Sequence, residues 1–436
     1  MRAISATLLV GAIACACGDT TTAPQPAPEP TPPAATPWSD AWLLAQTSSY
    51  LDDSTSRRSA LESSLANPAN MYSRIRLASY GLETRGWDLL PVWNPRSIPV
   101  TEELLPALER GDTPALPADQ PPLWNGVTPT TMPEWIALGR RVFFEYPMRS
   151  EVFMEYALTK PKLATAVGIE RTRDGALPGL VVFANIDGET RVGITCAICH
   201  SAVKNGEVVV GQARRTFDYG RLRLTFDRVH GTVRSPEEAK RMASWGPGRA
   251  DVTEDDDEDP VAIPDLWGLR HQRWLTQAGT IRQDSPLALA IRQETQLTDS
   301  NHARVRPPRE LAWALAMFVY SLSPPASEAA PSARGEALFT EHCARCHANA
   351  AYGGNTIAAA TIGTDPALAT GRGRGTGKYR VPTLLGVGDG APYLHDGSVG
   401  SLADLLSPTR STPGHRAGTE LAADDRDALI AFLRTL

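Results

Sequence analysis

The feature that most constrains this chain is a short motif of two cysteines and a histidine that occurs twice. Two thiols at this spacing lie on one turn and can each add to a vinyl group of one haem, and the adjacent histidine then reaches the iron. The motif therefore predicts two covalently bound c-type haems, haem 1 and haem 2, each with its histidine as proximal ligand. The two copies are Cys196-Ala-Ile-Cys199-His200 for haem 1 and Cys343-Ala-Arg-Cys346-His347 for haem 2.

Two other kinds of site use cysteines at the same spacing. A dithiol redox pair has it, and so does half of a zinc cluster. A redox pair does not explain the histidine that follows both motifs, and a zinc cluster would have to join half-sites about 140 residues apart. Haem attachment is the interpretation that accounts for both copies.

The N-terminus holds the other two cysteines. Residues 1–17 are a short apolar stretch with small residues before Cys15 and Cys17, typical of an export signal and too short to span a bilayer. The stretch resembles a bacterial lipoprotein signal in which Cys15 or Cys17 is acylated, although Ala12 or Ala14 stands where Leu or Val is usual. We expect a lipid anchor on the periplasmic or cell-surface face of a bacterial membrane, with plain secretion or an uncleaved N-terminus as alternatives.

Composition limits the remaining possibilities. Seven prolines between Pro24 and Pro37 predict a semi-rigid linker over 18–37 that holds the body away from a surface. With six cysteines in 436 residues and 42% hydrophobic residues, the chain is globular rather than a disulfide scaffold. The net charge of −6 gives no general attraction to nucleic acid, and beyond the N-terminus no apolar run could span a bilayer.

The last hundred residues have the pattern of a small haem domain. From Gly335 the chain leads directly into the second motif, and residues 425–436 close it with apolar residues at helical spacing. We predict a class I cytochrome c domain over 335–436, the C-terminal module. Its middle contains Val-Pro-Thr-Leu-Leu-Gly-Val at 381–387 and Pro-Tyr-Leu-His-Asp-Gly-Ser-Val at 392–399.

These segments, with 401–406, resemble the C-terminal haem domain of the bacterial dihaem cytochrome c peroxidase superfamily, which includes the MauG-type enzymes and the dihaem rubber oxygenases. The resemblance is specific over about 263–436 and loose before that. It implies an electron-transferring oxidoreductase with two haems.

An internal repeat supports the same architecture without the family. A shift of 118 residues lays 263–269 on 381–387 and 279–281 on 397–399, and a slightly different shift lays 314–322 on the C-terminal helix. We therefore predict an N-terminal module over 38–322 that closes with the same kind of helix, and a linker over 323–334.

The N-terminal module is enlarged. Residues 180–194 are two apolar runs around an Asp-Gly turn, which predicts a β-hairpin just before the first motif. Residues 138–145 resemble the helix that starts the N-terminal domain of bacterial peroxidases, but about 50 residues separate it from the motif, so no catalytic residue is carried over. Residues 38–130 read as a wrapping segment. The predicted fold is mainly α, with two tandem class I cytochrome c-like haem domains.

Function depends on whether each iron has a second protein ligand. Met317 is the last methionine, so the C-terminal module cannot offer one to haem 2. The resemblance to dihaem rubber oxygenases points to His415 as the distal ligand of haem 2, with His395 as the alternative ligand or as a hydrogen-bonding residue. For haem 1 the leading candidate is His302, which aligns within one residue of His415, and an open iron is the alternative.

Two functional hypotheses follow. In the first, the protein is an oxidoreductase that uses peroxide or dioxygen at haem 1 while haem 2 relays electrons. In the second, both irons are six-coordinate and the protein only carries electrons to and from a protein partner. The acidic run at 254–259 could bind calcium, which peroxidases of this superfamily often hold between their haems, although a solvated loop explains it as well.

The cysteine assignments predict the thiol content of the mature protein. Four thiols become thioethers, and one of the N-terminal pair is lost with the signal or acylated. The haem-loaded protein, denatured and titrated with a thiol reagent, is expected to show at most one free thiol per chain. Three or more reactive thiols would contradict haem attachment at both motifs.

Overall fold

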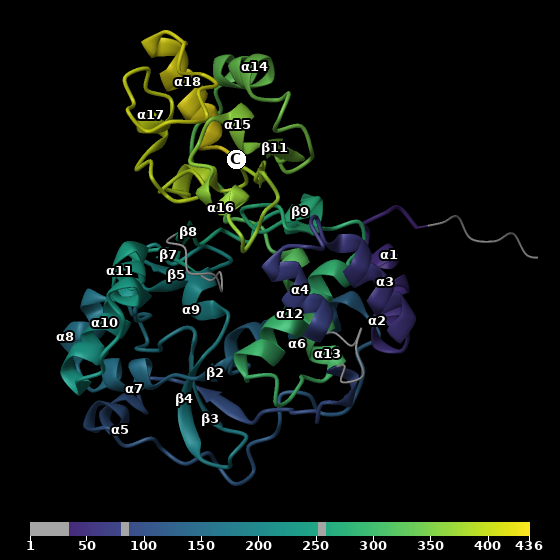
Figure 1. The fold of residues 1–436 in the computed structure, drawn as a ribbon, viewed down its shortest axis with the longest axis vertical. Coiled ribbons are helices and arrows are strands. Elements are labelled where there is room, and N and C mark those ends of the chain that lie inside the picture. The colour runs from purple at the N-terminus through teal and green to yellow at the C-terminus, as the bar shows by residue number, and fades with distance from the viewer. Residues whose placement is uncertain (1–34, 80–86, 252–258) are drawn as a thin grey trace, which may run out of the picture.

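The computed structural model describes residues 35–79, 87–251 and 259–436, and it is mainly helical with short strands, as the sequence predicts. Figure 1 shows the C-terminal module as a lobe above a larger body formed by the N-terminal module. Within the described residues no helix is long and apolar enough to cross a membrane. Cys15, Cys17 and the predicted linker up to residue 34 lie outside the described part of the chain.

The body is organised around a closely packed pair of helices, α6 (Met132–Glu145) and α13 (Arg309–Ser321). All ten residues from Leu311 to Tyr320 are buried. The two backbones approach at Gly139, where an added Cβ would lie 2.0 Å from the carbonyl oxygen of Ala314. One turn further, the rings of Phe143 and Phe318 pack at 5.3 Å. Only glycine allows this crossing, because any side chain at 139 would enter the facing helix.

The C-terminal module contains the same crossing, between α14 (Ala333–His342) and α18 (Ala423–Leu433). An added Cβ at Gly335 would again lie 2.0 Å from a carbonyl oxygen, that of Ala428. The rings of Phe339 and Phe432, one turn further, pack at 5.3 Å. Two helix pairs far apart in the sequence are therefore packed in the same way.

The repeated segments 263–281 and 381–399 also share their backbone conformation. Both segments place a left-handed residue at the same three positions, and two of the six carry a side chain, which rarely adopts this conformation. Each segment also contains a short 3-10 helix after its first left-handed residue, η2 (Leu269–His271) and η3 (Val387–Asp389). The paired positions, with φ in parentheses, are Gly268 (71°) and Gly386 (73°), Thr276 (66°) and Leu394 (69°), and Gly279 (57°) and Gly397 (68°).

The two modules contact each other through these repeated segments. An added Cβ on Gly386 would lie 2.2 Å from the ring of Trp267, and one on Gly268 would lie 3.0 Å from Leu385. Trp267 and Leu385 occupy the same repeat position, so the contact is reciprocal. A large side chain of each segment covers the glycine of the other segment. The two modules therefore contact each other through equivalent positions of the repeat.

The predicted hairpin is confirmed. It consists of β3 (Leu180–Ala184) and β4 (Thr190–Ile194), in register from Leu180 opposite Ile194 to Ala184 opposite Thr190. Two short strands extend it to a four-stranded sheet in the order β1-β3-β4-β2, with β1 at Ser97–Pro99 and β2 at Arg149–Ser150. On one side the sheet shares an apolar core with α5 (Leu105–Arg110), α7 (Val152–Leu158), α8 (Pro161–Ala166) and α10 (Tyr219–His230), and α11 (Pro236–Trp245) packs against α10.

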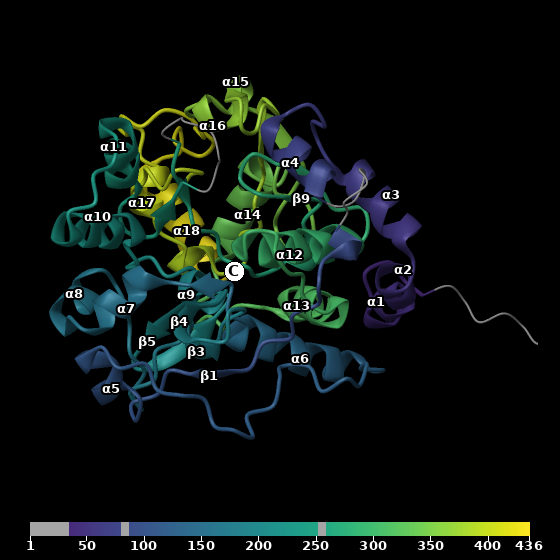
Figure 2. The ribbon, with the colours of Figure 1, turned by 60° about the horizontal axis from the view of Figure 1, so that its bottom comes forward.

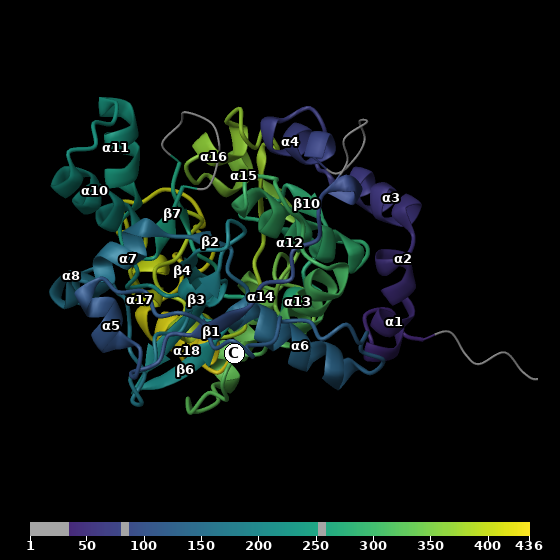
Figure 3. The same cartoon turned by 90° about the horizontal axis from the view of Figure 1, so that it is seen from below.

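The N-terminal segment lies on the outside of the body, at its edge in Figures 2 and 3. Tyr50 stacks on Trp313 at 5.4 Å, and its hydroxyl donates to the buried carboxylate of Glu294 on α12 (Leu287–Ser300) at 2.9 Å. The first part of the predicted wrapping segment thus packs on α12 and α13. The helices of this first part are α1 (Asp40–Ala45), α2 (Thr47–Leu51), α3 (Ser54–Ser64), α4 (Met71–Ser79) and η1 (Trp87–Leu89).

Small two-stranded sheets and single turns of helix complete the fold. Two-stranded pairs form between β5 (Ser201–Lys204) and β6 (Glu207–Val210), β7 (Arg249–Ala250) and β8 (Val261–Ala262), β9 (Trp274–Leu275) and β10 (Ile281–Arg282), and β11 (Thr356–Ala358) and β12 (Lys378–Arg380). The short helices are α9 (Ala197–His200), α15 (Ala359–Ile362), α16 (Ala367–Thr370) and α17 (Leu402–Leu405).

The helix crossing predicts the effect of one methyl group. Gly335→Ala gains about 1 kcal/mol of helix propensity but forces a Cβ against the Ala428 carbonyl, and overpacking of this kind costs about 1–3 kcal/mol. We expect a net loss of up to about 2 kcal/mol in the free energy of unfolding of the haem-loaded protein, measured by denaturant titration. Gly400→Ala is the control, because its nearest atom is 3.7 Å away. Equal stability of the two variants would contradict the proposed role of the crossing.

Candidate functional site

The first cysteine motif lies between the hairpin and β5, on the single turn of α9. The backbone of Gly179, which has φ 94°, passes directly over this turn, where an added Cβ would lie 2.2 Å from the Ile198 nitrogen. The Thr195 nitrogen donates to the Gly179 carbonyl at 2.9 Å. The segment next to the sheet therefore holds the backbone of the first motif in place. In the C-terminal module a helix directly precedes the motif instead.

His200 is oriented by a backbone carbonyl. Its Nδ1 lies 3.0 Å from the carbonyl oxygen of Pro264, so Nδ1 carries the proton and Nε2 is left as the ligating nitrogen. Burial lowers the pKa of His200 to about 4, so the imidazole is neutral at physiological pH, as metal ligation requires. Pro264 belongs to the repeated segment 263–269.

The thiols of Cys196 and Cys199 are free in the structure and half-buried. Burial raises the pKa of each to about 11, which keeps both in the thiol form. A reactive redox cysteine has a lowered pKa instead. These surroundings are therefore not those of a reactive dithiol pair.

The second motif directly follows α14. Nδ1 of His347 lies 2.6 Å from the Tyr352 carbonyl oxygen, and a hydrogen bond with the Pro382 backbone also affects the pKa of His347. Pro382 is the repeat partner of Pro264. Burial lowers the pKa of His347 to about 4, so this imidazole is also neutral. An added Cβ on Gly354 would lie 2.0 Å from the Cys346 carbonyl oxygen, so a glycine covers this motif too.

The structure brings His415 to the open side of His347. The centres of the two rings are 6.5 Å apart. An iron bonded at about 2 Å to one nitrogen of each ring, with each ring centre about 1 Å further, would separate the centres by about 6 Å. The pair therefore has the spacing that bis-histidine ligation of one iron needs.

The loop around His415 is fixed by hydrogen bonds. The His415 nitrogen donates to the Ile362 carbonyl at 3.0 Å, and Nη2 of Arg410 donates to the carbonyls of Gly414 at 2.6 Å and His415 at 2.9 Å. These bonds hold His415 in a left-handed conformation, φ 45°, that histidine adopts at a cost. Among the described residues its buried Nδ1 has no hydrogen-bond partner.

His395, the alternative ligand, has partners at both ring nitrogens. Its Nε2 lies 3.2 Å from the Tyr379 hydroxyl, and its Nδ1 lies 3.5 Å from the Thr364 hydroxyl. The rings of Tyr379 and His395 also pack at 4.2 Å. This arrangement favours the hydrogen-bonding role for His395 over ligation.

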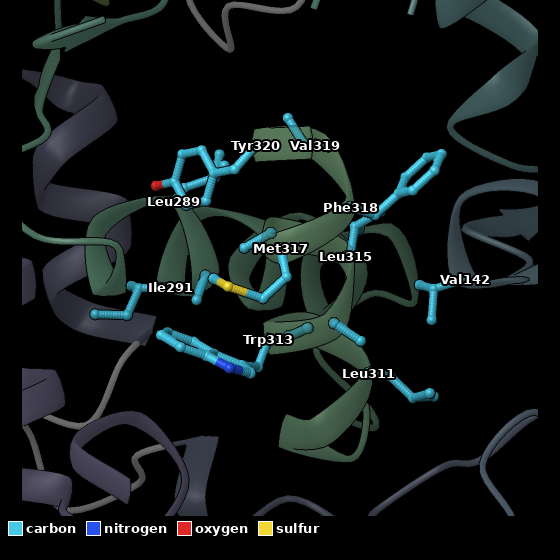
Figure 4. Close-up of a cluster of buried hydrophobic side chains, with 14 of the residues drawn as sticks. Val142, Leu289, Ile291, Leu311, Trp313, Leu315, Met317, Phe318, Val319 and Tyr320 are labelled. Carbon is cyan, nitrogen blue, oxygen red and sulfur yellow. The ribbon is translucent and has the colours of Figure 1, made fainter. Parts of the chain in front are cut away.

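His302 lies exposed in the turn after α12, with φ 57°. It shares the left-handed conformation of His415, its repeat partner, but its side chain faces solvent. The structure gives no support to His302 as a ligand of haem 1. Figure 4 shows Met317, the last methionine of the chain, packed beside Trp313 and Ile291 in the helical core.

Two arginines near the second motif fit the carboxylates that a haem carries. Nε of Arg380, and Nε and Nη1 of Arg410, are buried without a hydrogen-bond partner among the described residues. Burial lowers the pKa of Arg380 to about 10, and the side chain remains a cation. Propionates would satisfy these donors. The sequence gives no signal for Arg410, because its position depends on the folded loop.

The predicted calcium site is not tested. Within the described residues no group of three or more acidic, histidine or cysteine side chains could hold a metal ion. Residues 254–258 of the acidic run lie outside the described part of the chain.

Residues 332–436 match the family model for cytochrome c, three residues before the predicted start of the C-terminal module. This region is therefore a cytochrome c domain, a fold that binds haem and transfers electrons. No curated protein matches the sequence.

Two solved structures are similar to the chain. One is a MauG-like protein associated with microbial copper homeostasis, at 18% identity and a TM-score of 0.37, covering 81% of this chain and 95% of that one. The other is the hydrazine synthase of Kuenenia stuttgartiensis, at 15% identity and a TM-score of 0.34, covering 74% and 98%.

Proposed function

We propose that this protein, whose C-terminal region is a cytochrome c domain, is a dihaem c-type cytochrome of the MauG-type superfamily with one haem on each motif. The observation that carries the proposal is the repeated proximal arrangement. Each motif histidine is neutral, is oriented through Nδ1 by a backbone carbonyl, and interacts with the proline of a repeated segment, Pro264 or Pro382. A haem bound at each motif would supply one-electron chemistry and, where an axial position is open, a site for a small oxidant.

The two sites differ in whether a second histidine is available to the iron. At haem 2, His415 offers an imidazole at the spacing of a second ligand. Bis-histidine ligation lacks the thioether that raises the potential, and it suits an electron-transfer role. At haem 1 the leading histidine, His302, is exposed. This contrast favours an open iron at haem 1, where peroxide or dioxygen reacts, and a closed iron at haem 2, which relays electrons.

The contact between the modules suits this division of roles. Trp267 and Leu385 cover each other's repeat glycines, and each lies three residues after the proline that interacts with a motif histidine. The two proximal loops are therefore packed directly together. On the basis of the N-terminal signal, the proposal includes export and a lipid anchor. A partner protein would supply the electrons.

Spin state distinguishes the enzyme from a carrier. The oxidised, haem-loaded protein is expected to contain two haems per chain by the pyridine haemochrome assay. By EPR one haem of the oxidised protein is expected to be high-spin and one low-spin. Peroxide added to the oxidised protein and carbon monoxide added to the reduced protein should each perturb the spectrum of only one haem. Two low-spin haems that ignore both reagents would favour the carrier.

The ligand assignment at haem 2 has its own test. His415→Ala is expected to convert the low-spin haem to a high-spin signal, because the iron loses its second imidazole. His342→Ala is the matched control, since Nδ1 of that histidine lies 3.2 Å from the Glu420 carboxylate beside the same motif. His395→Ala is expected to keep the low-spin signal. An unchanged spectrum of His415→Ala would contradict the assignment.

A further inference from the structure

Arg215 connects the proximal loop of haem 1 to the C-terminal module. All three nitrogens of its guanidinium group donate hydrogen bonds, and the acceptors come from two distant parts of the chain. Nη1 donates to the Ile263 carbonyl, Nη2 to the Asp265 carboxylate at 3.0 Å and the Gly390 carbonyl at 3.0 Å, and Nε to the Ala391 carbonyl at 2.9 Å.

Two of these acceptors, Ile263 and Asp265, flank Pro264, whose carbonyl orients His200. The remaining oxygen of Asp265 accepts from the Ala213 nitrogen at 2.7 Å. The carbonyl that sets the geometry of the proximal ligand is thus fixed on both sides by one cation. Hydrogen bonding of this outer kind changes the basicity of a ligating histidine and the potential of its metal.

The two modules differ at this point. The repeat position of Asp265 holds Thr383, whose hydroxyl donates to the Ala351 carbonyl at 2.7 Å. Ala391 and Gly390 belong to the C-terminal module, so the cation beside the proximal loop of haem 1 is held in place by the module that carries haem 2. The pair Arg215 and Asp265 is mostly buried, with 20% and 15% of the side chains exposed, so water screens its charges little.

We propose that Arg215 is a positioning residue that sets the reduction potential of haem 1 and makes it depend on the docked C-terminal module. The proposal rests on the proposed function, because it requires haem at the first motif. A fixed cation near the iron disfavours the more positive ferric state, and it also neutralises Asp265. Without Arg215, the buried carboxylate would stabilise the ferric state.

The test compares the midpoint potentials of the two haems in the full, haem-loaded chain by spectroscopic redox titration. Haem 2 is identified as the one that His415→Ala alters. Arg215→Gln is expected to shift haem 1 to a more negative potential and to leave haem 2 unchanged. Arg215→Lys, which keeps the charge with fewer hydrogen bonds, is expected to shift haem 1 in the same direction but less. A purely structural role would shift both haems together.

Lys204→Gln is the matched control. Lys204 forms an ion pair with Asp389 at 2.6 Å, so it also joins the modules beside Asp265, but no hydrogen bond connects it to Ile263 or Asp265. Its half-exposed charge is screened, and the potential of haem 1 is expected to stay at the wild-type value. A shift equal to that of Arg215→Gln would overturn the proposal.

Haem content separates the two possible failures. Wild-type protein with a single haem on the second motif would overturn the proposed function and the role of Arg215 together. Two haems with an unchanged haem 1 potential in Arg215→Gln would overturn the role of Arg215 alone. If Arg215→Gln does not take up haem, Arg215→Lys decides the question, because an unshifted haem 1 in that variant would also overturn the proposal.

Discussion

Backbone contact between two helices, allowed by a single glycine, is the constraint on which both modules depend. At Gly139 and at Gly335 the facing carbonyl occupies the space of a Cβ. Helices that approach this closely fix the two ends of each module against each other. The loop between them then has a defined path, and the repeated segments 263–281 and 381–399 reach the motif histidines from the same direction.

The same scaffold supports two sites with different surroundings. In the C-terminal module a helix leads into the motif, and a loop fixed by Arg410 brings His415 within 6.5 Å of His347. In the N-terminal module a sheet leads into the motif, and the corresponding histidine, His302, is exposed. The repeat therefore preserves the surroundings of the two motif histidines, while the position of the aligned histidine and the nearby charges differ. Such a difference supports the proposed division between an open and a closed iron.

Several elements could be read from the sequence because their signals are local. The Asp-Gly turn of the hairpin and the apolar spacing of the closing helices each depend on residues close together in the chain, and the 118-residue repeat needs only a comparison of two short segments. His302 shows the limit of this reasoning. Its alignment with His415 predicted a similar role, and the backbone is similar, but the side chain faces solvent. Alignment compares positions along the chain, whereas ligation depends on the direction of one side chain.

The sequence alone determined the two attachment motifs, because the thiols and the histidine of each motif lie within one turn and need no distant partner. It also determined the repeat and the mainly helical fold. Tertiary structure decided which residues surround each site. Arg215 meets acceptors 48 to 176 residues away, and His415 meets His347 across most of the C-terminal module. Contacts over such distances depend on how the helices cross, and no local pattern of residues encodes them.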